Sequence, residues 1–265
     1  MTARILHVSD LHVGRHDAPE PIAALREIAA RFEPELVVAT GDLAHRGRRP
    51  QLETAVEMLG SLGLPVLSIP GNHDLPYTLA RFTRPFAEWE TCVGPREPDY
   101  VSERVAVFGL DSARPWRQQG GALEGAQLER LAARAAAVPA GALRVAALHH
   151  HLAAAPWRAR RKRPLSRRDD ALRAFAAAGM ELVLGGHVHQ TSVVERREFE
   201  ASDDGERRSL VLATAAALGR PRPRRRSEAV GCNVYEWDPS SIAVITFAWD
   251  GGAFDEIARR VFSRL

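Results

Sequence analysis

The chain has 265 residues, of which 45% are hydrophobic and 26% are charged, close to the average for globular proteins. This composition excludes a collagen-like fibre and a disordered tail, and the length suits one large domain or two small ones. No apolar run reaches the roughly 18 residues that a membrane-spanning helix needs. The start of the chain lacks the apolar core of a signal peptide, and Cys92 and Cys232 are too few for a disulfide framework. We therefore expect a cytoplasmic protein.

Positive charge is concentrated in two arginine-rich runs. The chain holds 36 Lys and Arg against 33 Asp and Glu, a net charge of +3. Residues 158–168 contain seven of the bases and residues 220–226 contain five, so the rest of the chain is acidic. A general affinity for nucleic acid therefore does not follow from the overall charge. The two runs are interpreted either as solvated loops or as a rim for an anionic substrate, because arginine suits bidentate phosphate contacts.

The first part of the chain alternates apolar runs of strand length with amphipathic segments. The apolar runs predict strands at residues 5–9, 36–40 and 66–69. Apolar residues at helical spacing predict helices at residues 21–32 and 52–62. Strands that alternate with helices in this way indicate βαβ units and a parallel sheet.

The rest of the chain changes from this alternation to consecutive strands. Two short strands are expected within residues 100–110, and helices at 125–138 and 166–178 alternate with strands at 144–148 and 181–184. The last quarter predicts strands joined by polar turns at residues 192–198, 209–214, 231–237 and 242–249, a pattern typical of antiparallel pairing. A short helix is expected at residues 255–262. No linker divides the chain, so we predict a single α/β domain over residues 1–265, with two sheets.

Side chains that bind metals follow five of the predicted strands, and they are Asp10, His12, Asp42, Asn72, His149, His187 and His189. In an open α/β sheet, ligands bind at the carboxyl ends of the strands. Because residues i and i+2 of an extended backbone point to one face, Asp10 with His12 and His187 with His189 can each aim at one metal cluster. Carboxylate, amide and imidazole groups suit divalent Mn, Fe, Zn or Co. Seven ligands are too many for one tetrahedral zinc, so we expect two divalent metal ions that share a carboxylate.

The order of the motifs (Asp-x-His, Gly-Asp, Gly-Asn-His-Asp, His, Gly-His-x-His) resembles the calcineurin-like metallophosphoesterase superfamily over residues 4–190. Residues 107–131 and the run at 148–151 resemble its bacterial class III cyclic-nucleotide phosphodiesterases, although Leu152 stands where that branch often has proline. The resemblance implies an αββα four-layer sandwich of two mixed β-sheets, with a di-metal site at the C-terminal ends of strands.

The resemblance also implies a role for each motif residue. Asp10, His12 and His189 would hold the first metal, Asn72, His149 and His187 the second, and Asp42 would bridge them. A hydroxide held between the metals would attack phosphorus in line with the leaving oxygen. His73 would lie beside the substrate and protonate that oxygen, with Asp74 orienting its ring.

The remaining histidines are expected to pack in the structure or to lie on the surface. His150 and His151 are expected to pack in the structure, with His151 the nearer of the two to a ligand, because adjacent residues on a strand face opposite ways. His7, His16 and His45 have no partner pattern and are interpreted as structural or surface residues. Asp111 is expected at a strand end or behind the metal ligands.

The sequence therefore predicts a metal-dependent phosphodiesterase acting on a small phosphodiester, with a 3′,5′-cyclic nucleotide as the leading candidate. One alternative is a nuclease or another phosphoesterase with a larger anionic substrate, which makes nucleic acid a less favoured partner. Another is a lipid-linked diphosphate hydrolase, which no amphipathic membrane segment supports. A binding scaffold would be expected to lose ligands, whereas all seven are present. The sequence assigns no substrate-binding residue, native metal pair or oligomeric state.

Overall fold

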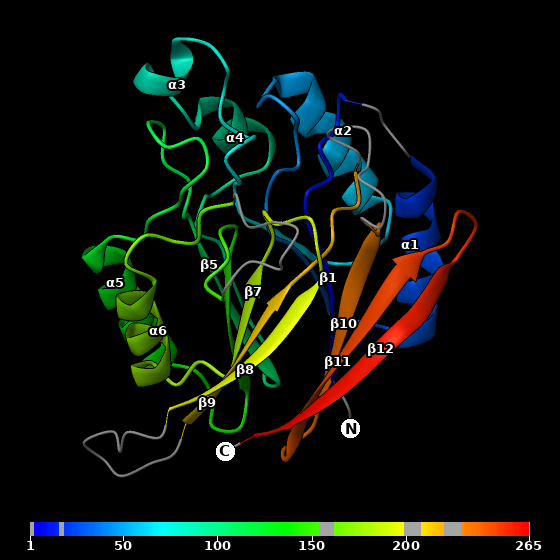
Figure 1. Ribbon diagram of the computed structural model, residues 1–265, viewed down its shortest axis with the longest axis vertical. Coiled ribbons are helices and arrows are strands. Elements are labelled where there is room, and N and C mark those ends of the chain that lie inside the picture. The colour runs from blue at the N-terminus through cyan, green and yellow to red at the C-terminus, as the bar shows by residue number, and fades with distance from the viewer. Residues whose placement is uncertain (1–2, 16–18, 154–161, 199–207, 220–228, 265) are drawn as a thin grey trace.

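Two mixed β-sheets pack face to face, and helices cover the outer face of each (Figure 1). The computed structural model describes residues 3–15, 19–153, 162–198, 208–219 and 229–264. Each sheet has six strands within these residues, and each combines parallel with antiparallel neighbours. The αββα four-layer sandwich implied by the sequence resemblance is thereby confirmed.

The first sheet carries the start of the chain at its centre and has the strand order β12-β11-β10-β1-β2-β3. Its parallel strands are β1 (Ala3–Val8), β2 (Leu36–Ala39) and β3 (Val66–Ser68). They are connected by α1 (Pro19–Phe32) and α2 (Arg49–Gly60), as the alternating pattern predicts. The antiparallel half consists of β10 (Gly231–Trp237), β11 (Ser241–Trp249) and β12 (Phe254–Ser263).

The second sheet has the strand order β4-β5-β6-β7-β9-β8. Its strands are β4 (Asp99–Val101), β5 (Val105–Leu110), β6 (Leu143–Leu148), β7 (Leu182–Gly185), β8 (Ser192–Glu198) and β9 (Arg208–Thr214). The predicted helices α5 (Gly125–Ala136) and α6 (Arg168–Ala177) lie on its outer face. Two short helices, α3 (Ala80–Thr83) and α4 (Ala87–Cys92), follow β3 and were not predicted. No helix among the described residues is long and apolar enough to cross a bilayer.

The helix expected at residues 255–262 is wrong, because this segment forms the edge strand β12. The Asp250 carboxylate accepts hydrogen bonds from the backbone N–H groups of Gly252 (2.7 Å) and Ala253 (2.8 Å). This turn reverses the chain directly after β11, so the next residues pair antiparallel with that strand along its whole length. Pairing with an existing strand satisfies the backbone groups and overrides the weak helical spacing of the side chains.

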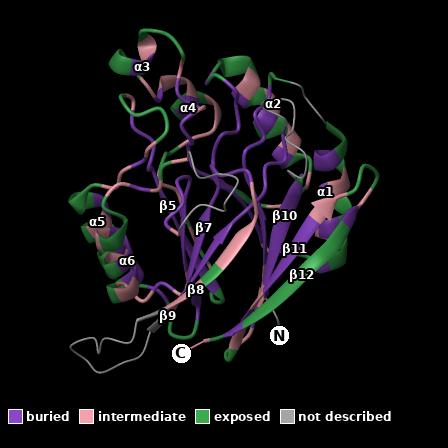
Figure 2. Cartoon of the chain, viewed as in Figure 1, coloured by how far each residue is buried: buried purple, intermediate pink, exposed green. Residues whose placement is uncertain are grey.

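Alternation along β1 divides its side chains between two cores. Ile5 is buried with residues of both sheets, whereas Leu6 and Val8 are buried with residues of α1 and α2. Figure 2 shows the consequence for the whole chain, since the strands between the helical layers are mostly buried and β12 is largely exposed. The sheets are therefore held in place from both faces, which fixes the positions of the loops at their carboxyl ends.

His7, a buried residue of β1, has both of its ring nitrogens hydrogen-bonded. The ring of His7 hydrogen-bonds to the Tyr235 hydroxyl and to the Thr40 hydroxyl, each at 2.9 Å. Burial lowers the pKa of His7 to about 3, so the ring is neutral and serves as a bridge between strands. The structural role expected for His7 is confirmed.

We expect Ile5→Ala and Leu6→Ala each to lower the free energy of unfolding by about 2–5 kcal/mol, because each removes a fully buried side chain from a different core. Val261→Ala on β12 is the control, since its side chain is 65% exposed and the expected change is within about 0.5 kcal/mol. Urea unfolding measures all three. A change as small as the control's in either core variant would contradict the two-core packing.

Candidate metal centre

All seven predicted metal ligands meet at one edge of the two sheets. Loops after β1, β2 and β3 bring Asp10, His12, Asp42 and Asn72 from the first sheet. Loops after β6 and β7 bring His149, His187 and His189 from the second sheet. Each of the seven side chains is at most 5% exposed. The site therefore lies where the sheets meet, at the carboxyl ends of their parallel strands, as predicted.

A first group of ligand atoms comes from Asp10, His12, Asp42 and His189, and these atoms all lie within 4.8 Å of one another. The Nε2 atom of His189 is 3.1 Å from Asp10 Oδ1 and 3.3 Å from His12 Nε2. The same His12 nitrogen is 3.7 Å from Asp10 Oδ1 and 3.7 Å from Asp42 Oδ2. Two carboxylate oxygens and two imidazole nitrogens thus converge on one small volume.

A second group lies on the other side of Asp42 and is formed with His149, His187 and Asn72. The Nε2 atom of His149 is 3.4 Å from Asp42 Oδ2, 3.2 Å from Asn72 Oδ1 and 3.3 Å from His187 Nδ1. The other carboxylate oxygen of Asp42 accepts a hydrogen bond from the His73 backbone N–H at 2.8 Å. Asp42 Oδ2 therefore faces both groups, which is the position that a bridging carboxylate requires.

Five of the seven ligand residues have a left-handed backbone, namely Asp10, His12, Asp42, His187 and His189, with φ between 50° and 69°. Such a conformation costs a non-glycine residue about 1–3 kcal/mol and persists where its surroundings impose it. Here the backbone N–H of Asp10 donates to Gly41 O and that of His12 to Asp42 O, both at 2.9 Å. The expectation that these pairs use extended backbone is wrong, although both pairs do reach the site.

The two i, i+2 pairs of ligand residues also differ in how they are distributed between the two groups of ligand atoms. Asp10 and His12 belong together to the first group, whereas His187 belongs to the second and His189 to the first. An extended backbone would have aimed both histidines at one group. In the structure both histidines have a left-handed backbone and lie in different groups, one on each side of Asp42.

The charge states of the ligands suit a cation. Burial opposes ionisation of Asp10, but His189 and the neighbouring imidazoles outweigh it and hold the carboxyl pKa well below its ordinary value. The pKa of Asp42 is likewise low, because His149 and other imidazoles outweigh burial. Burial lowers the pKa of His12 to about 4. Burial also holds the pKa of His187 well below its ordinary value. His149 is the exception, because the Asp42 carboxylate outweighs burial and raises the pKa of the His149 ring to about 9. Metals bind ionised carboxylates and neutral imidazoles, so a cation beside Asp42 would have to displace the proton of His149.

Two buried carboxylate oxygens of the ligand residues, Asp10 Oδ1 and Asp42 Oδ2, have no hydrogen-bond partner among the described residues. An unpaired buried polar atom is costly, and more so when it is charged. The two carboxylate oxygens are also the atoms that face the imidazole nitrogens. Divalent cations would satisfy these atoms, so the residues present fit a two-metal centre of the expected ligand types.

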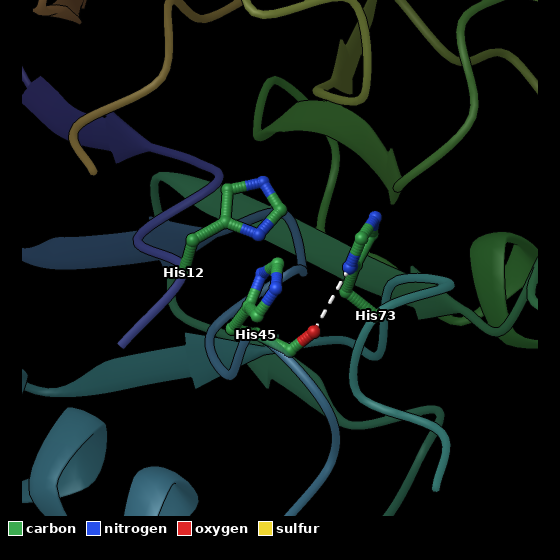
Figure 3. Close-up of side chains that lie close together, drawn as sticks. All are labelled: His12, His45 and His73. Atoms are coloured by element: carbon green, nitrogen blue, oxygen red, sulfur yellow. Dashed lines mark hydrogen bonds between the residues drawn. The ribbon is translucent and has the colours of Figure 1, made fainter. Parts of the chain in front are cut away.

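His73 lies at the edge of the first group and is held there by the backbone. Its Nδ1 atom is 2.9 Å from the carbonyl oxygen of His45 and 3.0 Å from the Tyr77 hydroxyl. Its ring meets the ring of His12 edge to face, with centroids 4.8 Å apart, and stacks on His45 at 5.4 Å. Figure 3 shows these three rings and the hydrogen bond from His73 Nδ1 to His45. His73 is half-buried, which leaves its ring accessible from solvent.

His45 is a residue whose place sequence reasoning missed. The sequence indicates a structural or surface role, yet the residue is only 9% exposed and its ring lies beside both His12 and His73. The Arg15 guanidinium is 3.2 Å from His45 Nε2. Burial, with help from His73 and Arg15, lowers the pKa of His45 to about 4, so Arg15 donates to a neutral ring. The only signal in the sequence was its position three residues after Asp42.

Asp74 does not orient His73, contrary to expectation. Its carboxylate accepts hydrogen bonds from the backbone N–H groups of Ala44 (2.7 Å) and Gly71 (2.8 Å). These bonds join the loop of Asp42 to the loop of Asn72. Gly71 is required there, because a Cβ atom on it would lie 2.2 Å from Asp42 Oδ1. The ring of His73 is positioned instead by the His45 carbonyl.

The other predicted side chains lie behind the ligands or outside the described part of the chain. His150 hydrogen-bonds to the Ser112 hydroxyl at 2.9 Å, and His151 stacks on His187 with ring centroids 5.9 Å apart, so both pack as expected. The expectation that His151 is the nearer of the two to a ligand is wrong, because the ring centroid of His150 is only 4.7 Å from that of His187. Asp111 follows β5 and pairs with Arg96 at 3.2 Å. His16, residues 158–161 of the first arginine-rich run and the whole run at 220–226 lie outside the described residues.

Comparison with known proteins identifies the family of the chain. The sequence profile of the calcineurin-like phosphoesterase family matches residues 3–191, and the chain belongs to that family. The chain is 32% identical over 145 residues to a probable cyclic nucleotide phosphodiesterase of a Synechococcus strain, and this stretch covers 49% of the chain and 52% of the relative. The chain thus spans about half the length of this relative.

Two further similarities concern other phosphoesterases. A glycerophosphodiester phosphodiesterase of Enterobacter lignolyticus is 36% identical over 76 residues, which cover 29% of the chain and 26% of the relative. The solved structure of a purple acid phosphatase from yellow lupin has the same fold, with a TM-score of 0.71 at 12% identity. That match covers 100% of the chain and 54% of the phosphatase.

We expect Mn²⁺ to raise the melting temperature of the chelator-treated protein, because it binds the unpaired atoms of the folded site. At a metal concentration a hundredfold above Kd, the stabilisation is about 2.7 kcal/mol. Asp42→Asn should lose most of this effect, since Asp42 faces both groups, whereas Asp255→Asn on the exposed face of β12 should keep it. Scanning calorimetry measures the shift. An equal shift in wild type and Asp42→Asn would show that Mn²⁺ binds elsewhere.

Proposed function

We propose that the chain is a metal-dependent phosphodiesterase that hydrolyses a small phosphodiester, with a 3′,5′-cyclic nucleotide as the leading candidate. The observation that carries the proposal is the pair of ligand groups that share Asp42 Oδ2, with His73 beside the first group. Membership of the calcineurin-like phosphoesterase family and two phosphodiesterase relatives support hydrolysis of a phosphate ester. The cyclic-nucleotide assignment is supported by one of those relatives and by the motif resemblance.

The chain would hold two divalent cations of the Mn, Fe, Zn or Co class. The first would be bound by Asp10, His12 and His189, the second by Asn72, His149 and His187, and both by Asp42. When bound, the cations supply Lewis acidity toward the phosphoryl oxygens and lower the pKa of the attacking water. The depth of the site serves this chemistry, because the ligand atoms lie out of contact with bulk water, where charge interactions are stronger.

His73 would act as the general acid through its Nε2 atom. The Nδ1–H group donates to the His45 carbonyl, so the proton available for transfer is the one on Nε2. The backbone N–H of the same residue donates to the Asp42 carboxylate, which fixes the acid relative to the bridging ligand. In the reaction, Nε2–H would pass its proton to the leaving alkoxide as the bond from phosphorus to that oxygen breaks.

We also propose that the protein acts in the cytoplasm. Cys92 and Cys232 are both free thiols, and Cys232 is buried, which suits a reducing compartment.

We expect His73→Ala to lower turnover of an alkyl phosphodiester such as 3′,5′-cAMP by about 10²–10⁴-fold. Turnover of bis(p-nitrophenyl) phosphate should fall much less, because p-nitrophenolate leaves without a proton. Steady-state kinetics on both substrates measure this contrast. Metal analysis of the variant is the control, and an unchanged metal content would exclude loss of the centre. Full activity of His73→Ala on both substrates would exclude the acid role.

The Mn-loaded protein should hydrolyse 3′,5′-cAMP at physiological concentrations in a panel with 2′,3′-cAMP, bis(p-nitrophenyl) phosphate, a glycerophosphodiester and single-stranded DNA. Product analysis by chromatography identifies which bond breaks. Hydrolysis of the generic diester alone would leave the metal chemistry in place and remove the cyclic-nucleotide assignment. Hydrolysis of DNA with affinity that falls steeply with salt would favour the nuclease alternative.

A further inference from the structure

An arginine-lined pocket of about 430 Å³ is bordered by Tyr77, whose hydroxyl is 3.0 Å from His73 Nδ1. Arg46 and Arg48 reach it from the loop that precedes α2, Arg49 from the first residue of α2, and Arg84 from the end of α3. These residues come from two stretches of chain, which pack against each other where α2 meets α4. None of them belongs to the two arginine-rich runs of the sequence.

The pocket carries an excess of positive charge that the described residues do not neutralise. Its lining includes four arginines against a single carboxylate, that of Glu88. Arg49 is neutralised by Glu53, whose carboxylate is 2.8 Å away on the next turn of α2. No carboxylate of the described residues forms an ion pair with Arg46, Arg48 or Arg84. Three cationic side chains therefore border a cavity large enough for a small anionic group.

The loop that carries these cations is ordered by its own contacts. The backbone N–H of Arg46 donates to the Gln51 side chain at 3.0 Å, and its guanidinium lies over the ring of Tyr77 at 6.0 Å from the centroid. The exposed guanidiniums keep the freedom to turn toward an anion. An arginine held over an aromatic ring still presents its edge N–H groups to phosphate oxygens.

Tyr77 connects the pocket to His73 at the edge of the metal centre. Tyr77 lines the pocket, and its hydroxyl is 3.0 Å from His73 Nδ1. Arg46 directly follows His45, whose carbonyl accepts the hydrogen bond from the same nitrogen. An anion in the pocket would therefore be separated from the ring of the proposed general acid by one tyrosine.

We propose that this pocket binds a second phosphate group of the substrate, so that the enzyme favours small phosphodiesters that also carry a phosphate monoester. A phosphate monoester brings a charge of about −1.5 to −2 and three acceptor oxygens, which matches several unpaired guanidiniums. The inference rests on the proposed phosphodiesterase activity and extends it to substrate selection. A 3′,5′-cyclic nucleotide has a single phosphate, so it would use the metal centre and leave this pocket to solvent.

The test compares two substrates that differ only in the second phosphate, thymidine 5′-(p-nitrophenyl phosphate) and the same compound phosphorylated at the 3′ oxygen. Wild type should prefer the 3′-phosphorylated compound in kcat/KM by about tenfold, which corresponds to about 1.4 kcal/mol. The double variant Arg46→Gln/Arg84→Gln should bring this ratio close to one. Arg31→Gln is the matched control, because Arg31 is an exposed arginine on α1 outside the pocket, and it should keep the wild-type ratio.

Equal kcat/KM for the two compounds in wild type would overturn the proposal and leave the phosphodiesterase assignment standing. A wild-type preference that survives in Arg46→Gln/Arg84→Gln would also overturn it, because the second phosphate would then bind elsewhere. If neither compound is hydrolysed, the phosphodiesterase assignment fails, and the pocket is then tested by phosphate binding alone. Calorimetric titration of the chelator-treated chain with inorganic phosphate should then show binding that the double variant loses. Equal binding, or none, in both proteins would overturn the pocket as a phosphate site.

Discussion

The centre depends on bringing together atoms that all carry lone pairs. Oxygens of Asp10 and Asp42 and ring nitrogens of His12, His149 and His189 lie 3.1–3.7 Å from their neighbours in a site cut off from solvent. Such an arrangement is costly in a buried site when it holds no cation, because unpaired acceptors face one another. A divalent cation placed between these atoms would attract all of their lone pairs, so their mutual repulsion would be replaced by attraction to the metal. The same feature therefore explains both why the site suits divalent metal ions and why the rest of the fold must hold it open.

The two packed sheets supply that support. Their parallel strands end at a common edge, and the loops that follow are tied to one another by backbone hydrogen bonds, as from Asp10 to Gly41. Asp74 joins two ligand loops through its carboxylate, and Gly71 gives the space that Asp42 needs. The left-handed backbone of five ligand residues is strained, and these contacts between the loops keep it in place. His73, fixed by a backbone carbonyl rather than a carboxylate, belongs to the same rigid network.

Much of this could be predicted from the sequence, because apolar runs and the polar residues that follow them are local signals. They located the parallel strands, the seven converging side chains and His73 beside them. Features that depend on the path of the folded chain could not be predicted in this way. The left-handed ligands break the extended spacing that was assumed, and β12 is a strand because a turn at Asp250 delivers it to β11. Arg46 and Arg84 are far apart in sequence and border one pocket only after α2 and α4 have packed.

The most direct test of the account is electron paramagnetic resonance of the Mn²⁺-loaded protein, titrated to saturation beside metal analysis. Two ions joined by the Asp42 carboxylate should give an exchange-coupled spectrum at a stoichiometry of two per chain. Asp42→Asn should replace it with the signal of isolated ions, while Asp255→Asn should leave it unchanged. A single, uncoupled Mn²⁺ per wild-type chain at saturation would contradict the claim that Asp42 links two metal sites.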